Sequence, residues 1–289
     1  MRQHTPLPTS TPYSAWTDSL SFLLLTRTDA VVPQAHRVGV SGACAPIQHF
    51  RDRNYGSHVM TIDLLRLHTR QLSACRRCHS AGFPVAGVPV SPARSEDIPT
   101  LLSRKARMLV VGQAPGRTEA TGTQAFIGAA GRTLFNWFAR AGIDEAGLRS
   151  SALIVAVTRC YPGPSATGRG DRVPTRIEVS LCRPWLEHER SLLRPSLIIP
   201  IGQMALHTMT GRSVLSEVIG KTIDSGGTTC IPLPHPSGSS AWTYGLGNRD
   251  RLEAALHLIG EWWNDHVGAE SPSGSAVTCS DNPEGRSTR

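Results

Sequence analysis

The sequence predicts an α/β protein of three layers, α/β/α, built on a central, mostly parallel four-stranded sheet. Short apolar segments alternate with amphipathic segments through the middle of the 289-residue chain. Parallel strands need a crossover connection, which is usually a helix, and a sheet covered on both faces has strands that are apolar throughout. The alternation of segments and the uniformly apolar strands together favour this fold class.

Two strands with a helix between them make up the first half of the predicted sheet. The strands are expected at residues 108–111 and 152–157, which are short apolar segments. Between them, the apolar residues of 134–138 recur at helical spacing, and Gly142 ends that helix. This strand–helix–strand order favours parallel pairing of the two strands.

The second half of the predicted sheet repeats this order. Thr175 and Glu178 have the spacing of a capping box, which predicts a helix from there to about Arg194. Two further apolar segments, residues 197–201 and 230–233, are expected to be the third and fourth strands. The predicted sheet therefore has four strands joined by helical crossovers.

One folded domain is expected over residues 60–267, closed by a last helix for which Asn248 is the candidate N-cap. Residues 1–59 mix Pro, Ser, Thr, His and Arg without periodicity, and are expected to be a poorly ordered extension. Met60 directly precedes an amphipathic segment and is a candidate for the native start. Residues 268–289 are rich in Ser, Gly and Pro and are expected to be a disordered tail.

Arginine dominates the charge of the chain. It supplies all but two of the 30 basic residues, the exceptions being Lys105 and Lys221, against 22 acidic residues, and the net charge is +8. Arginine binds phosphate oxygens in a forked geometry, so this excess favours nucleic acid as the partner. A codon bias toward arginine is the alternative explanation.

The longest apolar run near the start of the chain, residues 22–25, is too short for a membrane span or a signal peptide. Seven cysteines, an odd number, argue against a disulfide framework and for a reducing compartment. We therefore expect a cytoplasmic protein without membrane contact. The sequence has no long apolar heptad, which favours a monomer.

Four of the cysteines form a candidate metal centre. Cys75 and Cys78 are a Cys-x-x-Cys pair, and Cys160 and Cys182 flank a loop rich in Gly, Pro and Arg. Zinc ribbons usually bring together two close pairs, whereas one pair here is widely separated, so the spacing favours an iron–sulfur cluster. Zinc and unligated thiols remain open on spacing alone.

The loop after the first predicted strand reads Gly112-Gln113-Ala114-Pro115-Gly116. Glycine reaches backbone angles closed to other residues and proline fixes its own, so the loop can be rigid and approach a ligand closely. Strand ends of this kind line the binding crevice of open α/β sheets. We expect a ligand site here, with the Gln113 amide as its polar group.

Three further side chains are candidates for chemistry. His235 lies between two prolines that restrict its backbone, which suits charge stabilisation or proton transfer; a loop histidine without a task is the alternative. Glu119 follows the glycine-flanked loop and is placed to orient water. Phe126 is a candidate platform for a base. Taken singly, a surface glutamate and a core phenylalanine are the ordinary explanations for these two residues.

Four features occur together in this chain: the glycine-flanked loop with Glu119, the Phe126-Ile127-Gly128 turn, the four cysteines and His235-Pro236-Ser237. Their order and spacing resemble the iron–sulfur, family 4-like branch of the uracil-DNA glycosylase superfamily. The resemblance covers about residues 60–265. It implies an enzyme of base-excision repair that acts on DNA. It also implies a 4Fe-4S cluster with the ligands Cys75, Cys78, Cys160 and Cys182.

The resemblance implies a role for each matching residue. Gln113 contacts the flipped base, Phe126 stacks on it, Glu119 acts on the hydrolytic water, and His235 stabilises the anionic base as it leaves. The loop of residues 237–242 wedges into the duplex. The remaining implied contacts are those to the base by Ala114, Gly116 and Ala156, and those to DNA by Ser237, Gly238 and Ser239.

Three positions depart from the family pattern. Ala114 stands where the best-known uracil glycosylases have a catalytic aspartate, although family 4-like members also lack it. Ala156 replaces the asparagine that reads uracil, so a broader range of deaminated bases is expected. The long loop before Cys182 resembles that of a uracil-crosslinking subgroup, but Asp171 is the nearest counterpart of the capturing histidine, so no stable crosslink is expected. Arg169 and Arg172 in this loop are candidate phosphate contacts.

These residues predict a monofunctional glycosylase, because neither Lys105 nor Lys221 is placed to form a Schiff base with the sugar. A catalytically inactive iron–sulfur DNA-binding protein is the alternative, favoured by the two alanines. A nucleotide-hydrolysing enzyme is disfavoured, because the glycine-flanked loop lacks the Gly-Lys-Ser/Thr ending of a phosphate loop.

Overall fold

The computed structural model describes residues 55–268, apart from residues 88, 92, 95, 105–106, 122–123, 169, 238–241 and 243–244. The first described helix, α1 (Tyr55–Ser73), begins before the predicted domain boundary at residue 60. The predicted tail beyond residue 268 and nearly all of the predicted N-terminal extension lie outside the described residues. No helix among the described residues is long and apolar enough to cross a membrane.

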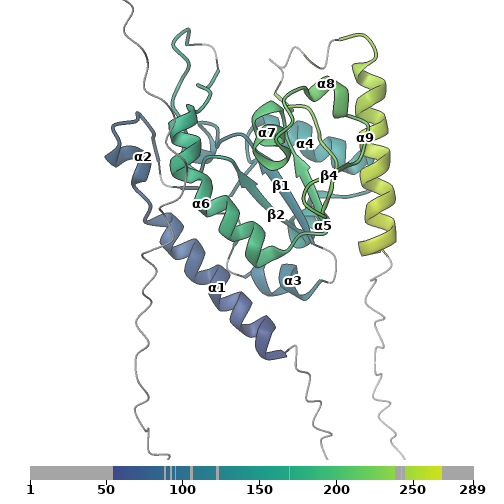
Figure 1. The fold of residues 1–289 in the computed structure, drawn as a ribbon, viewed down its shortest axis with the longest axis horizontal. Helices are drawn as coiled ribbons and strands as arrows, with labels where there is room; N and C mark the ends of the chain where they lie inside the picture. Colours follow the sequence, from purple (N-terminus) through teal and green to yellow (C-terminus); the bar gives the residue numbers. More distant parts are fainter. Residues whose placement is uncertain are drawn as a thin grey trace, which may run out of the picture. The chain divides into compact units, whose positions relative to one another are not determined.

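A mostly parallel sheet forms the centre of the described chain, which confirms the predicted fold class (Figure 1). Its strand order is β2-β1-β3-β5-β4. Pairing is parallel throughout except between the last two strands. The bounds are Met108–Gly112 for β1, Ala152–Ala156 for β2, Leu197–Pro200 for β3, Ile223–Asp224 for β4 and Thr229–Cys230 for β5.

The prediction of four strands is wrong by one, because the described sheet also contains β4. This strand has two residues, pairs antiparallel with β5, and is joined to it by a turn in which the N–H of Ser225 donates to the carbonyl of Thr228. Neither of its residues is fully buried. An edge strand this short gives no apolar run and no periodicity, so the sequence offered no signal for it.

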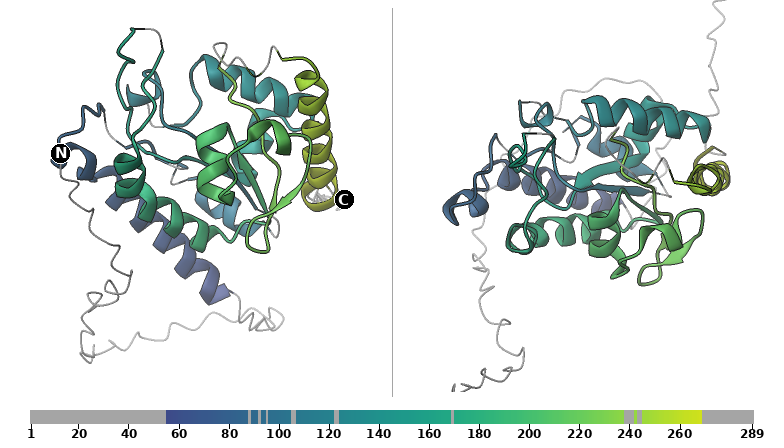
Figure 2. Two further views of the ribbon diagram at one scale, coloured as in Figure 1. Left: turned by 45° about the horizontal axis from the view of Figure 1, so that its top comes forward. Right: turned by 90° about the horizontal axis from the view of Figure 1, so that it is seen from above.

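Helices cover both faces of the sheet, as Figure 2 shows for α4 (Ala129–Arg140) and α6 (Arg176–Leu193). Successive residues of β1 serve opposite faces: Met108 and Val110 pack in the core with α4, whereas Leu109 and Val111 pack in the core with α6. The remaining elements are α2 (Arg77–Ser80), α3 (Ile98–Ser103), η1 (Glu119–Thr121), α5 (Glu145–Ser151), α7 (Gln203–Thr210), α8 (Leu215–Val218), α9 (Asn248–Trp263) and η3 (Asn264–Gly268).

The helix-end signals were read correctly in two of three cases. Thr175 and Glu178 form the predicted capping box at the start of α6, and Gly142 takes the left-handed conformation, with φ of +82°, just after α4. Asn248 is not the cap of α9: Gly247 precedes the helix, and the Asn248 amide donates to the carbonyl of Trp242 at 2.7 Å. Asn248 instead ties the start of α9 to the preceding loop.

The register of the sheet brings three loops to one edge. Gly112 at the end of β1 pairs with Ala156 at the end of β2, and the pairing continues as the N–H of Val157 donates to the carbonyl of Gly112 at 2.9 Å. Beyond β3 and β5, a parallel bridge joins Ile201 to Leu233. The loops that follow β1, β2 and β5 therefore all leave the sheet at its carboxyl edge.

Candidate functional site

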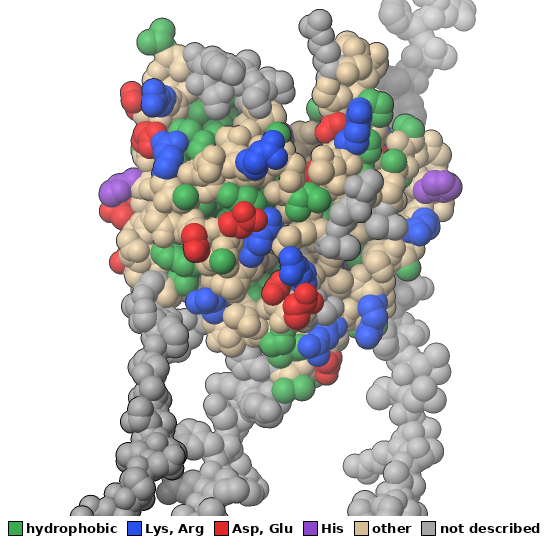
Figure 3. All heavy atoms as spheres, turned by 180° about the vertical axis from the view of Figure 1, so that it is seen from behind, with side chains coloured by type: hydrophobic (Ala, Val, Ile, Leu, Met, Phe, Trp, Pro, Cys, Tyr) green, Lys and Arg blue, Asp and Glu red, His purple; other side chains and the backbone are tan. Residues whose placement is uncertain are grey.

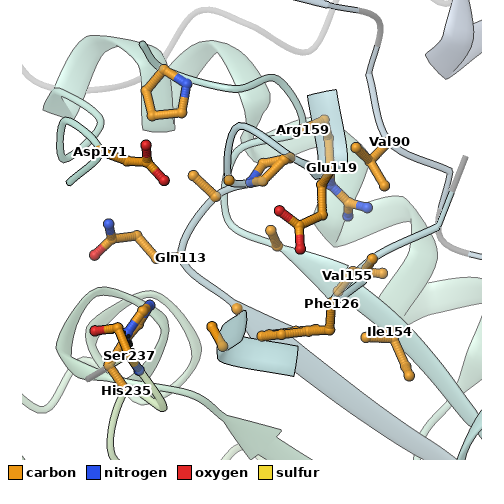
Figure 4. A pocket seen from close by; sticks show the side chains of 18 of the residues that line it. Val90, Gln113, Glu119, Phe126, Ile154, Val155, Arg159, Asp171, His235 and Ser237 are labelled. Carbon is orange, nitrogen blue, oxygen red and sulfur yellow. Dashed lines mark hydrogen bonds between the residues drawn. The ribbon is translucent and has the colours of Figure 1, made fainter. Parts of the chain in front are cut away.

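A cavity of about 350 Å³ opens at this carboxyl edge (Figure 4). Its wall includes the glycine-flanked loop after β1, the loop after β2 and the loop after β5, together with Val90 and residues between Glu119 and Ala130. It brings together all seven residues that sequence analysis placed at the base and the reaction. These are Gln113, Ala114, Gly116, Glu119, Phe126, Ala156 and His235.

Phe126 lies against the end of β1 as part of this wall. A Cβ at Gly112 would lie 3.0 Å from the Phe126 ring, so the ring packs directly on the strand backbone. Phe126 has φ of +58°, a conformation that phenylalanine rarely adopts and that costs of order 1–3 kcal/mol. The start of α4 also crowds it, since a Cβ at Gly131 would lie 1.8 Å from the Phe126 carbonyl oxygen. The ring is therefore held by its backbone surroundings.

Glu119 is the first residue of η1, and only 8% of its surface is exposed. Its Oε1 accepts a hydrogen bond from the N–H of Gly128 at 3.0 Å. Its Oε2 lies 2.7 Å from the position that a Cβ at Gly116 would take, so a glycine is needed there for the carboxylate to keep this place. The glycine-flanked loop and the turn after Phe126 thus fix the carboxylate between them.

His235 enters the cavity from the loop after β5. Its Nδ1 accepts a hydrogen bond from the N–H of Ser237 at 3.3 Å and lies 3.0 Å from the Ser237 hydroxyl oxygen. Burial lowers the pKa of His235 below its ordinary value. A neutral imidazole whose Nδ1 accepts a hydrogen bond carries its proton on Nε2. His235 is thereby prepared as a neutral donor through Nε2–H.

Arg172 lines the cavity, but its donors are directed into the protein. Its guanidinium forms a bidentate ion pair with Glu178, with two N···O distances of 2.8 Å. It also donates two hydrogen bonds to the carbonyl of Pro162, at 2.7 and 3.0 Å, and one to the carbonyl of Val173 at 3.5 Å. The hydrogen bonds from Arg172 lower the pKa of Glu178 to about 2. These contacts use all five side-chain N–H groups, which favours an anchoring role for Arg172 over the predicted phosphate contact.

Of the other candidate DNA contacts, only Ser237 lies among the described residues, and it lines the cavity. Arg169, Gly238 and Ser239 lie outside them. On the face drawn in Figure 3, basic and acidic side chains are interspersed, so the basic excess is not gathered into one patch there.

A second cavity, of about 120 Å³, brings the four predicted cluster ligands together. Cys75 follows α1, Cys78 lies in α2, Cys160 follows β2, and Cys182 lies in α6. Burial, together with the charges of neighbouring cysteines, raises the pKa of Cys160 to about 12 and that of Cys182 to about 11. None of the cysteines among the described residues forms a disulfide.

The geometry around these cysteines can be tested against the candidate metals. Among the described residues, no group of three or more His, Cys, Asp or Glu is arranged so that it could hold a metal ion. Arg76, Arg77 and Arg159 also line the cavity. Their positive charges favour a bound centre whose total charge, including the four cysteine thiolates, is negative. Four cysteines that line one cavity supply the donor set of an iron–sulfur cluster, and the same donor set also suits a tetrahedral zinc ion.

Sequence reasoning missed Arg159, which lines both cavities. Its side chain is 2% exposed and pairs with the fully buried carboxylate of Glu189. The other oxygen of Glu189 accepts a hydrogen bond from Nε2 of the buried His68 at 2.9 Å. Arg159 thus pairs with a residue of α6, which is in turn held by a residue of α1, and no local pattern in the sequence signals contacts over such separations.

Comparisons with known proteins agree with this geometry. The family model of the uracil DNA glycosylase superfamily matches residues 99–259. The type-4 uracil-DNA glycosylase of Pyrobaculum aerophilum is 30% identical over 165 residues, which are 55% of this chain and 74% of the relative. That of Archaeoglobus fulgidus is 29% identical over 201 residues, or 66% of this chain and 89% of the relative.

A third relative, the type-4 uracil-DNA glycosylase of Thermotoga maritima, is 31% identical over 134 residues, which are 45% of this chain and 65% of the relative. The family model spans more than half of the chain and includes the loops after β1, β2 and β5 that build the larger cavity. The chain therefore belongs to the uracil DNA glycosylase superfamily.

Proposed function

We propose that this protein is a monofunctional DNA glycosylase that hydrolyses the N-glycosidic bond of uracil, or of another deaminated base, in DNA. One observation carries the proposal: a single cavity is lined by an aromatic ring, an amide, a buried carboxylate and a neutral histidine, namely Phe126, Gln113, Glu119 and His235. Membership of the superfamily makes the chain a glycosylase-type hydrolase, and its type-4 relatives support uracil as a substrate.

The base is bound outside the helix, since an enzyme cannot reach a glycosidic bond within the stack without flipping the nucleotide, at a cost of a few kcal/mol. Phe126 offers a ring face that its backbone fixes in place, and Gln113 supplies an amide for the polar edge of the base. Ala156 contributes only a methyl group beside them. Such a pocket favours planar bases in general, so it supports activity on deaminated bases besides uracil.

Bond cleavage places negative charge on the departing base and positive charge on the sugar. His235 donates from Nε2–H to the base, and because its imidazole is already neutral, the donor needs no proton transfer before the bond breaks. Glu119, held by the N–H of Gly128, orients water toward the sugar carbon and accepts its proton. The negative charge on the base is thus stabilised by His235, and Glu119 serves the reaction at the positively charged sugar.

The cysteine cavity is the proposed site of a 4Fe-4S cluster, with Cys75, Cys78, Cys160 and Cys182 as ligands. When bound, such a cluster supplies a covalent cross-link between distant segments and a centre able to exchange electrons. Burial raises the pKa of both thiols, so binding of iron releases protons from Cys160 and Cys182. Iron and sulfide analysis of anaerobically purified protein tests this assignment.

A Schiff-base mechanism is not supported, because lysine occurs only at two positions. Lys221 is exposed and does not line the cavity, and Lys105 lies outside the described residues. We therefore expect strand cleavage only after added alkali. We expect the protein to act on DNA as a monomer, because the sequence has no long apolar heptad.

A single-turnover assay tests the proposed function. Single- and double-stranded oligonucleotides containing uracil, hypoxanthine or xanthine are incubated with excess protein and then treated with alkali. We expect excision of uracil and of at least one other deaminated base, with none from undamaged DNA. If every strand stays intact while DNA is bound, the inactive DNA-binding alternative, which Ala114 and Ala156 would favour, replaces the enzyme.

A further inference from the structure

A second carboxylate lies at the proposed reaction centre. Oδ2 of Asp171 is 3.4 Å from the position that a Cβ at Gly116 would take, and Oε2 of Glu119 is 2.7 Å from the same position. Both residues line the larger cavity, and Figure 4 shows Asp171 and Glu119 on different sides of it. Two carboxylates from distant parts of the chain therefore face each other across one glycine.

The loop that carries Asp171 is fixed at both of its ends. The N–H of Arg172 donates to the carbonyl of Gly163 at 2.9 Å, and an antiparallel bridge joins Asp171 to Pro164. The guanidinium of Arg172 is in turn held by Glu178 and by the carbonyl of Pro162. The backbone at Asp171 is thus preorganised by its neighbours, although the side chain itself is exposed to solvent.

The two carboxylates lack direct charge partners in the described part of the chain. Neither Asp171 nor Glu119 forms an ion pair there, and the exposed guanidinium of Arg117 is a positive charge near Asp171. Two like charges near one point are unfavourable unless a positive charge comes between them. The substrate can provide one, because the sugar becomes cationic as the glycosidic bond breaks.

From this geometry we infer that Asp171 is a second catalytic carboxylate, which faces the sugar of the flipped nucleotide and stabilises its developing positive charge. This inference rests on the proposed function. Both electrons of the C1′–N bond leave with the base, the water oxygen forms the new C1′–O bond, and the water proton passes to Glu119. Asp171 stays ionised and forms no covalent bond. It therefore keeps its charge beside the sugar while Glu119 is neutralised.

The test separates the charge of Asp171 from its shape. Asp171→Asn keeps the shape and removes the charge, and Asp171→Glu keeps the charge. Asp250→Asn is the matched control, because Asp250 is exposed on α9 and does not line the cavity. Two quantities are measured: the single-turnover rate of uracil excision, and the affinity for DNA carrying a cationic pyrrolidine analogue of the sugar relative to a neutral tetrahydrofuran analogue.

We expect Asp171→Asn to slow excision by about 10- to 100-fold and to reduce the preference for the cationic analogue by about 10-fold. Asp171→Glu should recover part of both, and Asp250→Asn should change neither. Melting temperatures show whether each variant is folded, with Asp171→Ser as a second neutral variant. An excision rate and analogue preference in Asp171→Asn equal to those of Asp250→Asn would overturn the inference.

The two proposals can fail separately. If the wild-type protein excises no damaged base, the proposed function is wrong, and the preference for the cationic analogue alone then decides whether Asp171 faces a positive sugar. If the wild-type protein excises uracil and Asp171→Asn does so equally fast, only the role of Asp171 is wrong.

Discussion

Replacing Gly116 by alanine should impair the reaction more than the binding of the base. The new Cβ would lie 2.7 Å from Oε2 of Glu119, whereas ordinary contact begins at 3.4 Å, so the carboxylate must retreat by about 0.7 Å. A displacement of about 1 Å at a reacting centre can cost 10²-fold in rate. We therefore expect the single-turnover rate of Gly116→Ala to fall by about 10- to 100-fold.

Gly112→Ala is the matched variant, because its Cβ would meet the Phe126 ring at 3.0 Å and not Glu119. It should weaken the binding of DNA that contains a non-cleavable damaged nucleotide, whereas Gly116→Ala should lose much less affinity for this DNA than it loses in rate. Rates come from rapid-mixing experiments at saturating protein, and affinities from fluorescence anisotropy. The argument is wrong if Gly116→Ala reacts at the wild-type rate, or if its loss lies entirely in affinity.

Three further predictions concern His235, Ala156 and Arg172. His235→Ala should lose about 2.7–4 kcal/mol of transition-state stabilisation, seen as a rate two to three orders of magnitude lower. Because the pKa of His235 is lowered from 6.5, the wild-type rate should be constant around neutral pH and fall only below pH 6.5. A rate that already falls above pH 7 would contradict this expectation. Ala156→Asn should raise the ratio of uracil to hypoxanthine excision by about 10-fold, because it adds an amide to the base pocket; an unchanged ratio would show that residue 156 does not contact the base. Arg172→Ala should lower the free energy of unfolding by about 2 kcal/mol at pH 7. The Glu178 pKa falls from 4.5 to about 2 on folding, so the wild-type advantage should be complete above pH 4.5 and vanish as the pH approaches 2, as followed by thermal unfolding.

Most of the fold could be predicted from short sequence patterns. The unbroken apolar run of residues 108–111 indicates a buried strand. The spacing of Thr175 and Glu178 indicates the start of a helix, because their capping hydrogen bonds span one turn. Both features depend only on neighbours in the chain, so the sequence sufficed to predict them. The strand at Ile223–Asp224 depends instead on its partner, which explains why it was missed.

The candidate site could be predicted as far as its residues act alone. Gln113, Glu119, Phe126 and His235 were found by their motifs, and the described structure gathers them around one cavity. Contacts between segments that are distant in the sequence could not be predicted from it. Glu178 was read as a capping residue, but the same carboxylate also binds Arg172, and the approach of Asp171 to Gly116 depends on how that loop folds back.

Arg159 gives the two cavities a common wall, and this has a thermodynamic consequence. Any occupant of the cysteine cavity that repositions this guanidinium also changes the wall of the base pocket, since the side chain lines both. Linkage is reciprocal: to the extent that filling one cavity alters the affinity of the other, the second alters the first by the same factor. Damaged DNA would then protect the proposed cluster against loss by the same factor by which that cluster raises the affinity for damaged DNA.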